Sequence, residues 1–479
     1  MKSTASDGDA TGDGSTDRTR IWIALIVAAT FFMENLDGTV IATAVPDMAR
    51  SFGAEPIDLD TGVSAYLLTL GVFIPISGWI ADRFGARLVF SSAIVIFTVA
   101  SLLCGMAQSL EVFVALRVLQ GIGGAMMVPV GRLVVLRSTP KDQLIHAIAM
   151  LTWPALIGPV LGPAVGGFLT TYASWRWIFY LNLPIGALVF AAVLLLFPKV
   201  PPQAPRPFDW AGFLLTGMAL FALMWAVEVV SGPAVSWMEA VLWFAGGTAL
   251  MVLGIRHLQR ADNPMVALSA LKVPTFAVTI WGGSLFRMGI NAVPFLLPLM
   301  FQVGFGLSAF DAGLLVIAVF AGNMLIKPAT TPILRRFGFR PVLIVNGLLN
   351  VAAIGACALL TADTPRILVM ALLFVGGLTR SMQFTAINTI AFADIPKEGM
   401  TAANTLFSTA FQLAMGLGIA LGAIAYRVGG WFMSLGGGND PTTPFHIAFV
   451  IVALVSLVGL ADCLQLDPEA GHHVSRKAA

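Results

Sequence analysis

Two carboxylates, Glu34 and Asp37, are the only charged residues in the apolar stretch from Ile21 to Val45. At a rise of about 1.5 Å per residue, a helix of this length crosses a bilayer core of roughly 30 Å. Residues three apart share one helical face, and a charge in hydrocarbon costs at least about 2.5 kcal/mol without a partner. We therefore expect both acids to face a watery cavity or a cation. The plainer alternative is that both belong to buried ion pairs that only fix helix positions.

The composition of the chain is that of a membrane protein with many spans. Hydrophobic residues make up 58% of the 479 residues and charged residues only 11%, and a water-soluble domain cannot hide so much apolar surface. The net charge of +2 does not favour nucleic acid as a partner. The three cysteines have no spacing that predicts a disulfide and no neighbouring His cluster that predicts a metal site.

Apolar runs of about 20 residues, separated by charged or Pro/Gly breaks, predict fourteen membrane helices. Their expected first residues are Ile21, Asp60, Leu88, Leu110, Leu144, Trp175, Trp210, Trp237, Thr275, Phe310, Arg340, Arg366, Thr401 and Pro444. The expected fold class is therefore an all-α polytopic membrane protein. The intervals between these helices are too short for a soluble catalytic domain.

The positions of Lys and Arg predict how the chain lies in the membrane. Nineteen of the 27 such residues lie at the termini or on one set of alternate loops. The positive-inside rule places this set in the cytoplasm, and an even number of spans then places both termini there as well. We expect the polar residues 1–20 to form a disordered cytoplasmic tail and residues 466–479 to form a second cytoplasmic tail.

An internal repeat divides the chain into two halves. The loop from Asp82 to Val89 returns 253 residues later as Arg335 to Val342, each time after the second helix of its half. This predicts six-helix bundles at 21–200 and 261–465, with a linker and an inserted two-helix hairpin at 201–260. The same offset carries Glu34 onto Arg287 near the middle of the membrane. Parallel repeats bind substrate between them at that depth, and we expect this acid and base to neutralise each other there.

Three glycine-containing motifs accompany the charges of the first half. The first joins the second and third helices and contains Gly78, Asp82, Arg83, Gly85 and Arg87. The second runs from Arg117 to Ala125 and places glycines after the guanidinium. The third lies in the fifth helix and contains Gly158, Pro159, Gly162, Pro163, Gly166 and Gly167. Its glycines leave one helix face almost without side chains, and we expect that face to pack closely against a helix of the second half.

In this order the motifs resemble the signature motifs of the major facilitator superfamily. Together with Leu36 to Val40, Trp175 to Pro184 and Phe208 to Gly212, they make residues 20–465 similar to the family of 14-helix drug:proton antiporters. Two residues depart from the family pattern. Ala86 stands where the loop motif has a further base, and Arg335 replaces the acid in the second copy of the loop.

The resemblance implies roles for particular residues. Asp37 would carry protons with Arg117 as its charge partner, the loop motif would be a cytoplasmic latch, and the fifth-helix motif would be a hinge surface typical of exporters. Helix directions support the first pairing independently, because the first helix runs outward, the fourth runs inward, and both residues then lie in the outer half. A carboxylate that alternately gains and loses an Arg neighbour can take up and release a proton in each cycle.

The second half carries the intramembrane bases. The expected substrate cavity consists of Glu34 with these bases and their neighbouring amides: Arg287, Asn291, Asn323, Lys327, Arg380, Gln383 and Asn388. Fixed bases repel an organic cation and can bind a carboxylate or phosphate. The plainer alternative is that Arg287 pairs with Glu34 and that Lys327 and Arg380 cap helix ends or reach the cytoplasmic interface.

The sequence therefore predicts a proton-coupled antiporter that exports small amphiphilic organic compounds or drugs across a bacterial inner membrane by alternating access. The alternative is a narrower exporter of an anionic metabolite or a metal-carboxylate chelate. A membrane-embedded enzyme is disfavoured because the five histidines lack catalytic or metal-binding spacing. The fifth-helix motif and the pairing of Asp37 with Arg117 disfavour a channel. We expect no cofactor, a monomeric chain, and only substrate, protons and lipid as partners.

Overall fold

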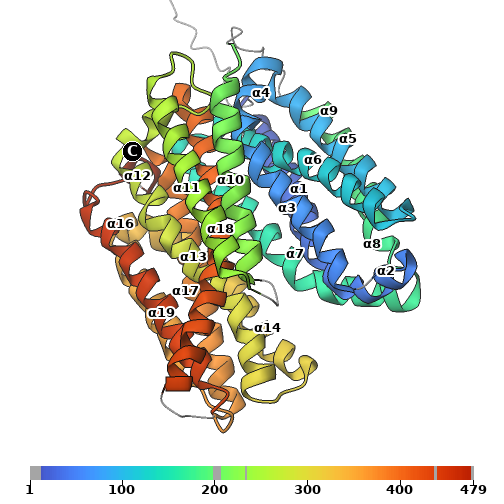
Figure 1. Ribbon diagram of the computed structural model, residues 1–479. Helices are drawn as coiled ribbons and strands as arrows, with labels where there is room; N and C mark the ends of the chain where they lie inside the picture. The colour runs from blue at the N-terminus through green and yellow to red at the C-terminus, as the bar shows by residue number, and fades with distance from the viewer. Residues whose placement is uncertain (1–11, 55, 198–206, 232–234, 436–439, 476–479) are drawn as a thin grey trace, which may run out of the picture.

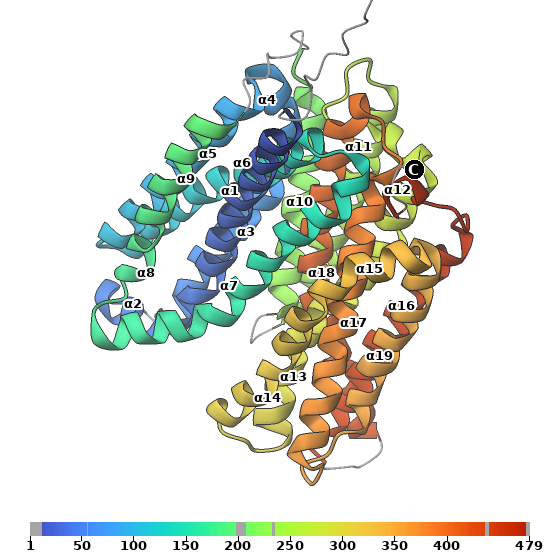
Figure 2. The ribbon, with the colours of Figure 1, turned by 180° about the vertical axis from the view of Figure 1, so that it is seen from behind.

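Two bundles of helices build the molecule (Figures 1 and 2). The computed structural model describes residues 12–54, 56–197, 207–231, 235–435 and 440–475. The longer helices of the first bundle are α1 (Gly12–Val40), α3 (Asp60–Phe73), α5 (Ala86–Met106), α6 (Leu110–Ser138), α7 (Leu144–Tyr172) and α9 (Asn182–Leu196), with the short helices α2 (Val45–Phe52), α4 (Ser77–Phe84) and α8 (Trp177–Tyr180). Every regular element in these ranges is a helix.

The second bundle follows an inserted hairpin. The hairpin consists of α10 (Trp210–Ser231) and α11 (Trp237–Arg260). The bundle contains α12 (Pro274–Ile280), α13 (Gly282–Leu299), α14 (Ala309–Leu325), α15 (Lys327–Phe337), α16 (Phe339–Ala356), α17 (Arg366–Ala393), α18 (Met400–Leu435) and α19 (Thr443–Leu460), followed by the short α20 (His472–Ser475).

The helices agree with the predicted fourteen spans. Twelve are long and apolar enough to cross a membrane by themselves. A thirteenth span is the pair α14 and α15, which is bent by 50° at Ile326. The remaining predicted span is α7, a helix of 29 residues, which is long enough to cross a bilayer. The chain is therefore a multi-pass membrane protein.

The two bundles meet at one end and separate at the other (Figure 2). One apolar cluster contains residues of both bundles, such as Val130 of α6 and Phe392 of α17. Two further clusters each belong to one bundle, around Phe113 in the first and around Phe445 in the second. Because apolar burial joins the halves at one end only, the molecule is closed at the end where α4 and α20 lie and open at the end where α2 and α14 lie.

The described parts of the two predicted tails, 1–20 and 466–479, are ordered. Residues 1–11 lie outside the described part of the tail predicted at 1–20, but α1 already begins at Gly12. A helix that is nucleated by a long apolar span extends at little further cost, which explains why polar residues continue it. At the other end, Leu466 and Val474 are buried within the shared apolar cluster. The described part of the tail, up to Ser475, therefore packs onto the closed end.

The inserted hairpin is held by an acid at its start. Asp209 accepts hydrogen bonds from the amides of Gly212 (2.8 Å) and Met265 (3.2 Å), and its carboxylate lies 2.7 Å from Nε2 of His257 on α11. Burial alone would raise the pKa of Asp209, but these amides and the His257 side chain outweigh it, so the pKa lies below its ordinary value. The acid joins the two hairpin helices to the chain that enters the second bundle.

The glycine face of α7 packs against α1, and not against the second half as the sequence suggested. A Cβ atom at Gly158 would lie 3.0 Å from the amide nitrogen of Leu36, and one at Gly162 would lie 2.9 Å from Cβ of Thr39. Gly166 faces Val40 and Thr43 in the same way. Glycines spaced four residues apart predict a helix face without side chains, but their spacing does not determine which neighbouring helix packs against that face. Pro159 and Pro163 lie within α7, and their side chains are outside the described part of the chain.

The close approach of α7 to α1 gives a prediction about stability. Leucine at Gly162 has no room beside Thr39, so Gly162→Leu should push α1 away and cost about 1–3 kcal/mol, the range for overpacked cores. Gly167 is the matched control, because nothing lies within 4 Å of a Cβ placed there. Thermal unfolding of the purified variants should show a lower melting temperature for Gly162→Leu and little change for Gly167→Leu. Equal melting temperatures would contradict the packing described here.

Candidate functional site

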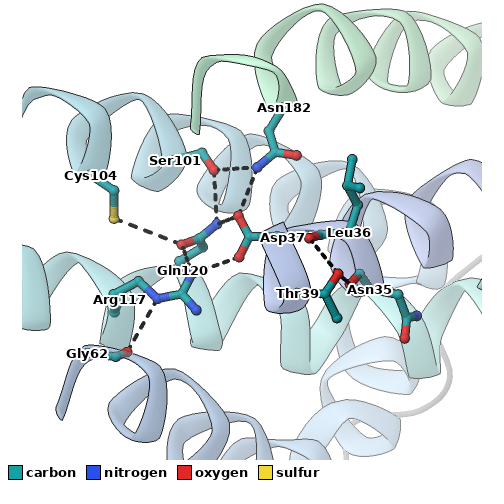
Figure 3. Close-up of polar contacts among 10 residues, drawn as sticks. All are labelled: Asn35, Leu36, Asp37, Thr39, Gly62, Ser101, Cys104, Arg117, Gln120 and Asn182. Atoms are coloured by element: carbon teal, nitrogen blue, oxygen red, sulfur yellow. Dashed lines mark hydrogen bonds and ion pairs between the residues drawn. The ribbon is translucent and has the colours of Figure 1, made fainter. Parts of the chain in front are cut away.

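Asp37 is a fully buried carboxylate that is bound by three donors (Figure 3). Its Oδ2 lies 2.7 Å from Nη1 of Arg117 on α6, in an ion pair in which neither side chain is exposed. Its Oδ1 accepts hydrogen bonds from Gln120 Nε2 and from Asn182 Nδ2, both at 2.9 Å. The sequence predicted the pairing of Asp37 with Arg117, and the structure brings the two residues into direct contact.

A second shell of hydrogen bonds fixes the donors. Ser101 on α5 accepts from Gln120 at 2.9 Å and from Asn182 at 2.8 Å, so both amides are shared between Asp37 and this hydroxyl. Gln120 Oε1 accepts from Arg117 at 2.7 Å. The sequence analysis did not assign these three polar residues. The spacing of Gln120 one turn after Arg117 was the available signal, whereas Ser101 and Asn182 are placed only by the tertiary fold.

Arg117 is held from its other side by α3 and the residues around it. Its Nε donates to the carbonyl of Gly62 at 3.3 Å, and its guanidinium carbon lies 4.2 Å from the ring centroid of Tyr66. Its Nη2 is buried and has no hydrogen-bond partner. Four contacts thus position a guanidinium whose Nη2 still has no acceptor.

Glu34 lies one turn before Asp37 in a different environment. It is partly exposed, and its buried Oε2 has no hydrogen-bond partner. The nearby hydroxyl of Tyr66 is also without a partner, and both groups approach Gly124, where a Cβ would lie 3.4 Å from Oε2 and 3.2 Å from the hydroxyl. Asp37 is therefore fully bound, whereas Glu34 has an unused oxygen in a space that a glycine leaves open.

The expected ion pair between Glu34 and Arg287 is not formed. Arg287 is buried on α13, where its Nη1 donates to the carbonyl of Thr279 at 2.9 Å and its Nη2 donates to Asn388 Oδ1 at 3.2 Å. The break between α12 and α13 at Trp281 brings the Thr279 carbonyl within reach. Equivalent positions in two repeats lie at the same depth in the membrane. The direction of each side chain depends on its own neighbours, so equal depth does not bring Glu34 and Arg287 into contact.

Arg132 on α6 faces the part of α1 that carries Glu34, because Phe31, one turn before Glu34, lies beside its guanidinium. Its guanidinium carbon lies 5.4 Å from the ring centroid of Phe31 and 5.1 Å from that of Phe407, and its Nη1 donates to Ser408 at 3.4 Å. The sequence analysis did not assign Arg132 to the site. Its partners Phe407 and Ser408 lie on α18, so only the tertiary fold brings them to Arg132.

The other predicted cavity residues have separate positions. Lys327 stands at the start of α15, next to the bend, and its Nζ donates to Thr152 of α7 at 3.0 Å and to Thr385 of α17 at 2.9 Å. It therefore bridges the two bundles. Gln383 is bonded to Leu343 and Asn346 of α16, and Asn291 donates to the carbonyl of Arg287. Asn323 is buried with both side-chain atoms unpartnered, and Arg380 is half-buried on α17.

The loop motif takes part in a contact between the bundles at the closed end. Asp82 Oδ1 lies 3.0 Å from Arg137 Nη2 and accepts a hydrogen bond from Thr401 of α18 at 3.2 Å. Arg137 also donates to Thr401. Gly78 lies directly against Thr401 and Thr405, where a side chain would collide.

The remaining residues of the motif lie around this contact. Gly85 ends α4 with a φ of +87°, a conformation that favours glycine. Arg87 bonds to the Leu194 carbonyl within its own bundle, and Arg83 is exposed. The base that holds Asp82 is therefore Arg137, which the sequence analysis did not assign.

A second set of contacts joins the bundles beside this one. Lys141 follows α6, and its Nζ donates to the carbonyls of Phe392 (2.6 Å), Ala393 (2.8 Å) and Ile395 (2.7 Å) at the end of α17. A cation suits this place, because a helix C-terminus has unpaired carbonyls and a partial negative charge. Arg335, which replaces the acid of the second loop copy, donates to the carbonyl of Asp142 at 3.0 Å.

Chemically, the arrangement can hold a negative charge inside the first bundle. Three donors converge on one buried carboxylate, so its oxygens are satisfied without water. Within the described ranges, no three His, Cys, Asp or Glu side chains converge in a way that could hold a metal ion.

Comparison with known proteins gives the same family as the motifs. The family model of the major facilitator superfamily matches residues 27–419 and 279–479. A protein of Cronobacter sakazakii named "Putative multidrug resistance protein MdtD" is 38% identical over 435 residues, which cover 91% of this chain and 92% of that one. A Klebsiella pneumoniae protein of the same name is 37% identical over 443 residues, covering 92% and 93%.

Solved structures show the same fold at low sequence identity. The proton:xylose symporter XylE superposes with a TM-score of 0.65 at 15% identity, covering 96% of this chain and 98% of that one. The human organic anion transporter MFSD10 superposes with a TM-score of 0.63 at 14% identity, covering 94% and 98%. Because the family model matches most of the chain and the relatives align over more than nine-tenths of it, the chain belongs to the major facilitator superfamily.

Proposed function

We propose that the protein is a proton-coupled antiporter that exports small amphiphilic organic compounds, drugs among them, by alternating access. The observation that carries the proposal is the buried Asp37, which is bound by Arg117, Gln120 and Asn182. An ionisable group is costly to keep inside a membrane, and such groups in transport proteins mark paths of ions and protons. The multidrug resistance proteins to which the chain is similar support drugs as the substrate class.

The proposed cycle uses the two environments of the acids. In the present form the bundles are closed at the end of the chain termini, and Asp37 has the contacts of an ionised carboxylate. A proton that reaches Asp37 from the open side neutralises it and weakens its bond to Arg117. The bundles then reorient, substrate binds from the other side, and its binding favours release of the proton. Glu34, with its unpartnered oxygen, offers a second place for a proton close to the substrate.

The setting of this cycle is a bacterial inner membrane with both termini in the cytoplasm. The excess of Lys and Arg at the termini and alternate loops supports this orientation. The open end of the present form then faces outward. The proton gradient supplies the energy, no cofactor is needed, and a single chain contains both bundles of the transport unit.

The second candidate is an exporter of an anionic metabolite or a metal-carboxylate chelate. It is favoured by Arg287 and Lys327 of the second bundle, whose hydrogen bonds go to neutral groups. Arg287 donates to Thr279 and Asn388, and Lys327 donates to two threonine hydroxyls. Bases with neutral partners keep their charge available for an anion.

The test of proton coupling is Asp37→Asn in proteoliposomes. An imposed pH gradient should drive substrate uptake by the wild-type protein, and the variant should lose this response because asparagine cannot carry a proton. The variant also leaves Arg117 as an unpaired buried charge, a change that costs about 3–5 kcal/mol. Its melting temperature must therefore be measured beside its transport.

The double variant Asp37→Asn with Arg117→Gln separates the two effects. It removes both charges, so the melting temperature should recover relative to the single variant while the response to the pH gradient stays absent. Undiminished gradient-driven transport by Asp37→Asn would show that protons travel by another route.

Alternating access gives a second prediction at the closed end. Lys141→Met removes three charge-assisted hydrogen bonds between the bundles, so the closed state should lose about 2 kcal/mol or more, about a thirtyfold shift in population. Spin labels at Gln143 and Lys397 should report longer distances in this variant. Lys272→Met, a change of an exposed lysine in the loop before α12, is the control and should leave the distances unaltered. If Lys141→Met leaves the population of the closed state unchanged, the contact of Lys141 with α17 forms when the bundles close but does not stabilise the closed state.

A further inference from the structure

Two arginines from opposite bundles approach the same aromatic ring. The guanidinium carbon of Arg132 on α6 lies 5.1 Å from the ring centroid of Phe407 on α18, and that of Arg287 on α13 lies 4.8 Å from the same centroid. The two guanidinium carbons are therefore at most about 10 Å apart. Phe31 of α1 and Phe411 of α18 extend the aromatic surroundings, at 5.4 Å from Arg132 and 5.6 Å from Arg287.

Neither arginine of this pair has a carboxylate partner among the ion pairs of the described residues. Arg132 donates to a serine hydroxyl, Arg287 donates to a backbone carbonyl and an amide oxygen, and Arg287 Nε is buried without a partner. Glu34 lies one turn after Phe31, whose ring lies beside Arg132, whereas Asp37 is already bound by Arg117.

Two like charges at one apolar place repel each other, and aromatic contacts offset only part of the loss of water around them. An anion between them would relieve the repulsion and use the free donors. Charge-assisted hydrogen bonds from arginine are the strongest that a protein can offer to a carboxylate, sulfonate or phosphate. The surrounding rings match an apolar group attached to that anion.

We propose that Arg132 and Arg287 together bind the anionic group of an amphiphilic organic anion, and that Phe31, Phe407 and Phe411 contact its apolar part. The proposal rests on the proposed export function, of which it names the substrate class. Because the two arginines belong to different bundles, a bound anion holds the bundles together. Glu34 competes with the anion for Arg132, which links anion binding to the charge of an acid in the site.

The experiment measures binding of three probes that share one ring system. The probes are 1-naphthalenesulfonate, an anion, 1-naphthylmethylamine, a cation, and 1-naphthalenemethanol, which is neutral. Isothermal titration calorimetry is carried out with the purified full chain in lipid nanodiscs, and the heat of empty nanodiscs is subtracted. The wild-type protein should bind the sulfonate more tightly than the amine or the alcohol.

The arginine variants should weaken binding of the anion alone. Arg132→Gln and Arg287→Gln should each reduce the affinity for the sulfonate about tenfold or more, the usual effect of losing a hydrogen bond to a charged group. Their affinity for the alcohol should stay within about twofold. Arg340→Gln, in which the lost hydrogen bond is to Leu464 at the end of the bundle, is the matched control and should change neither value.

Glu34→Gln should act in the opposite direction. Removing the acid that competes for Arg132 should raise the affinity for the sulfonate, whereas a cation site would lose affinity for the amine instead. If a glutamine variant does not fold, Arg132→Lys and Arg287→Lys replace it. Lysine retains the charge but not the two-pronged donor, so the affinity should fall between those of arginine and glutamine.

Two results would overturn the proposal. One is equal binding of the sulfonate and the amine by the wild-type protein, and the other is unchanged sulfonate affinity in folded Arg132→Gln and Arg287→Gln. Failure of the export function is recognised separately. One outcome is that a pH gradient drives no transport while the affinity for the sulfonate still depends on both arginines. In that case the proposed anion site is supported and the proposed proton coupling is wrong. If the pH gradient drives transport of the amine, and neither arginine variant changes that transport, the proposed proton coupling is supported and the proposed anion site is wrong.

Discussion

The ion pair between Asp37 and Arg117 is the interaction on which the rest of the structure depends. Both side chains are fully buried, and their separation of 2.7 Å offsets part of the cost of removing two charges from water. The remaining cost is met by Gln120 of α6, by Asn182 of α9 and by the carbonyl of Gly62 in α3. Such a site is stable only while all its members are in place. Loss of any one of them leaves a buried charge or polar group without its partner.

The packing around this site explains how a local change of charge can reach the closed end. The glycine face of α7 holds α1 directly beside Asp37, so a shift of α1 is transmitted to a helix that also bridges to Lys327 of the second bundle. At the closed end, Asp82, Arg137 and Lys141 join the bundles through polar contacts, and one apolar cluster covers both. The opposite end has separate apolar clusters. Apolar burial therefore joins the two bundles at the closed end and not at the opposite end.

Much of the fold could be predicted from the sequence because it follows from hydropathy. The many membrane helices and the ion pair of Asp37 with Arg117 depend on span length, loop charge and depth, which are properties of the chain itself. Predictions that needed a direction for a side chain or a helix face were wrong. The glycines of α7 face α1, and Glu34 and Arg287 do not form an ion pair. Arg132, Arg137 and Ser101 were missed because their partners are distant in sequence, so only tertiary packing brings them together.

The central claim is that substrate and proton compete through one buried carboxylate, and proton release on substrate binding tests it most directly. The purified full chain is placed in a weakly buffered solution with a pH indicator, and a substrate found by transport screening is added. The account predicts that the wild-type protein releases protons as substrate binds, that release is largest where Asp37 is protonated before binding, and that Asp37→Asn binds substrate with much less release. Binding without any proton release by the wild-type protein, or equal release by the variant, would contradict the account.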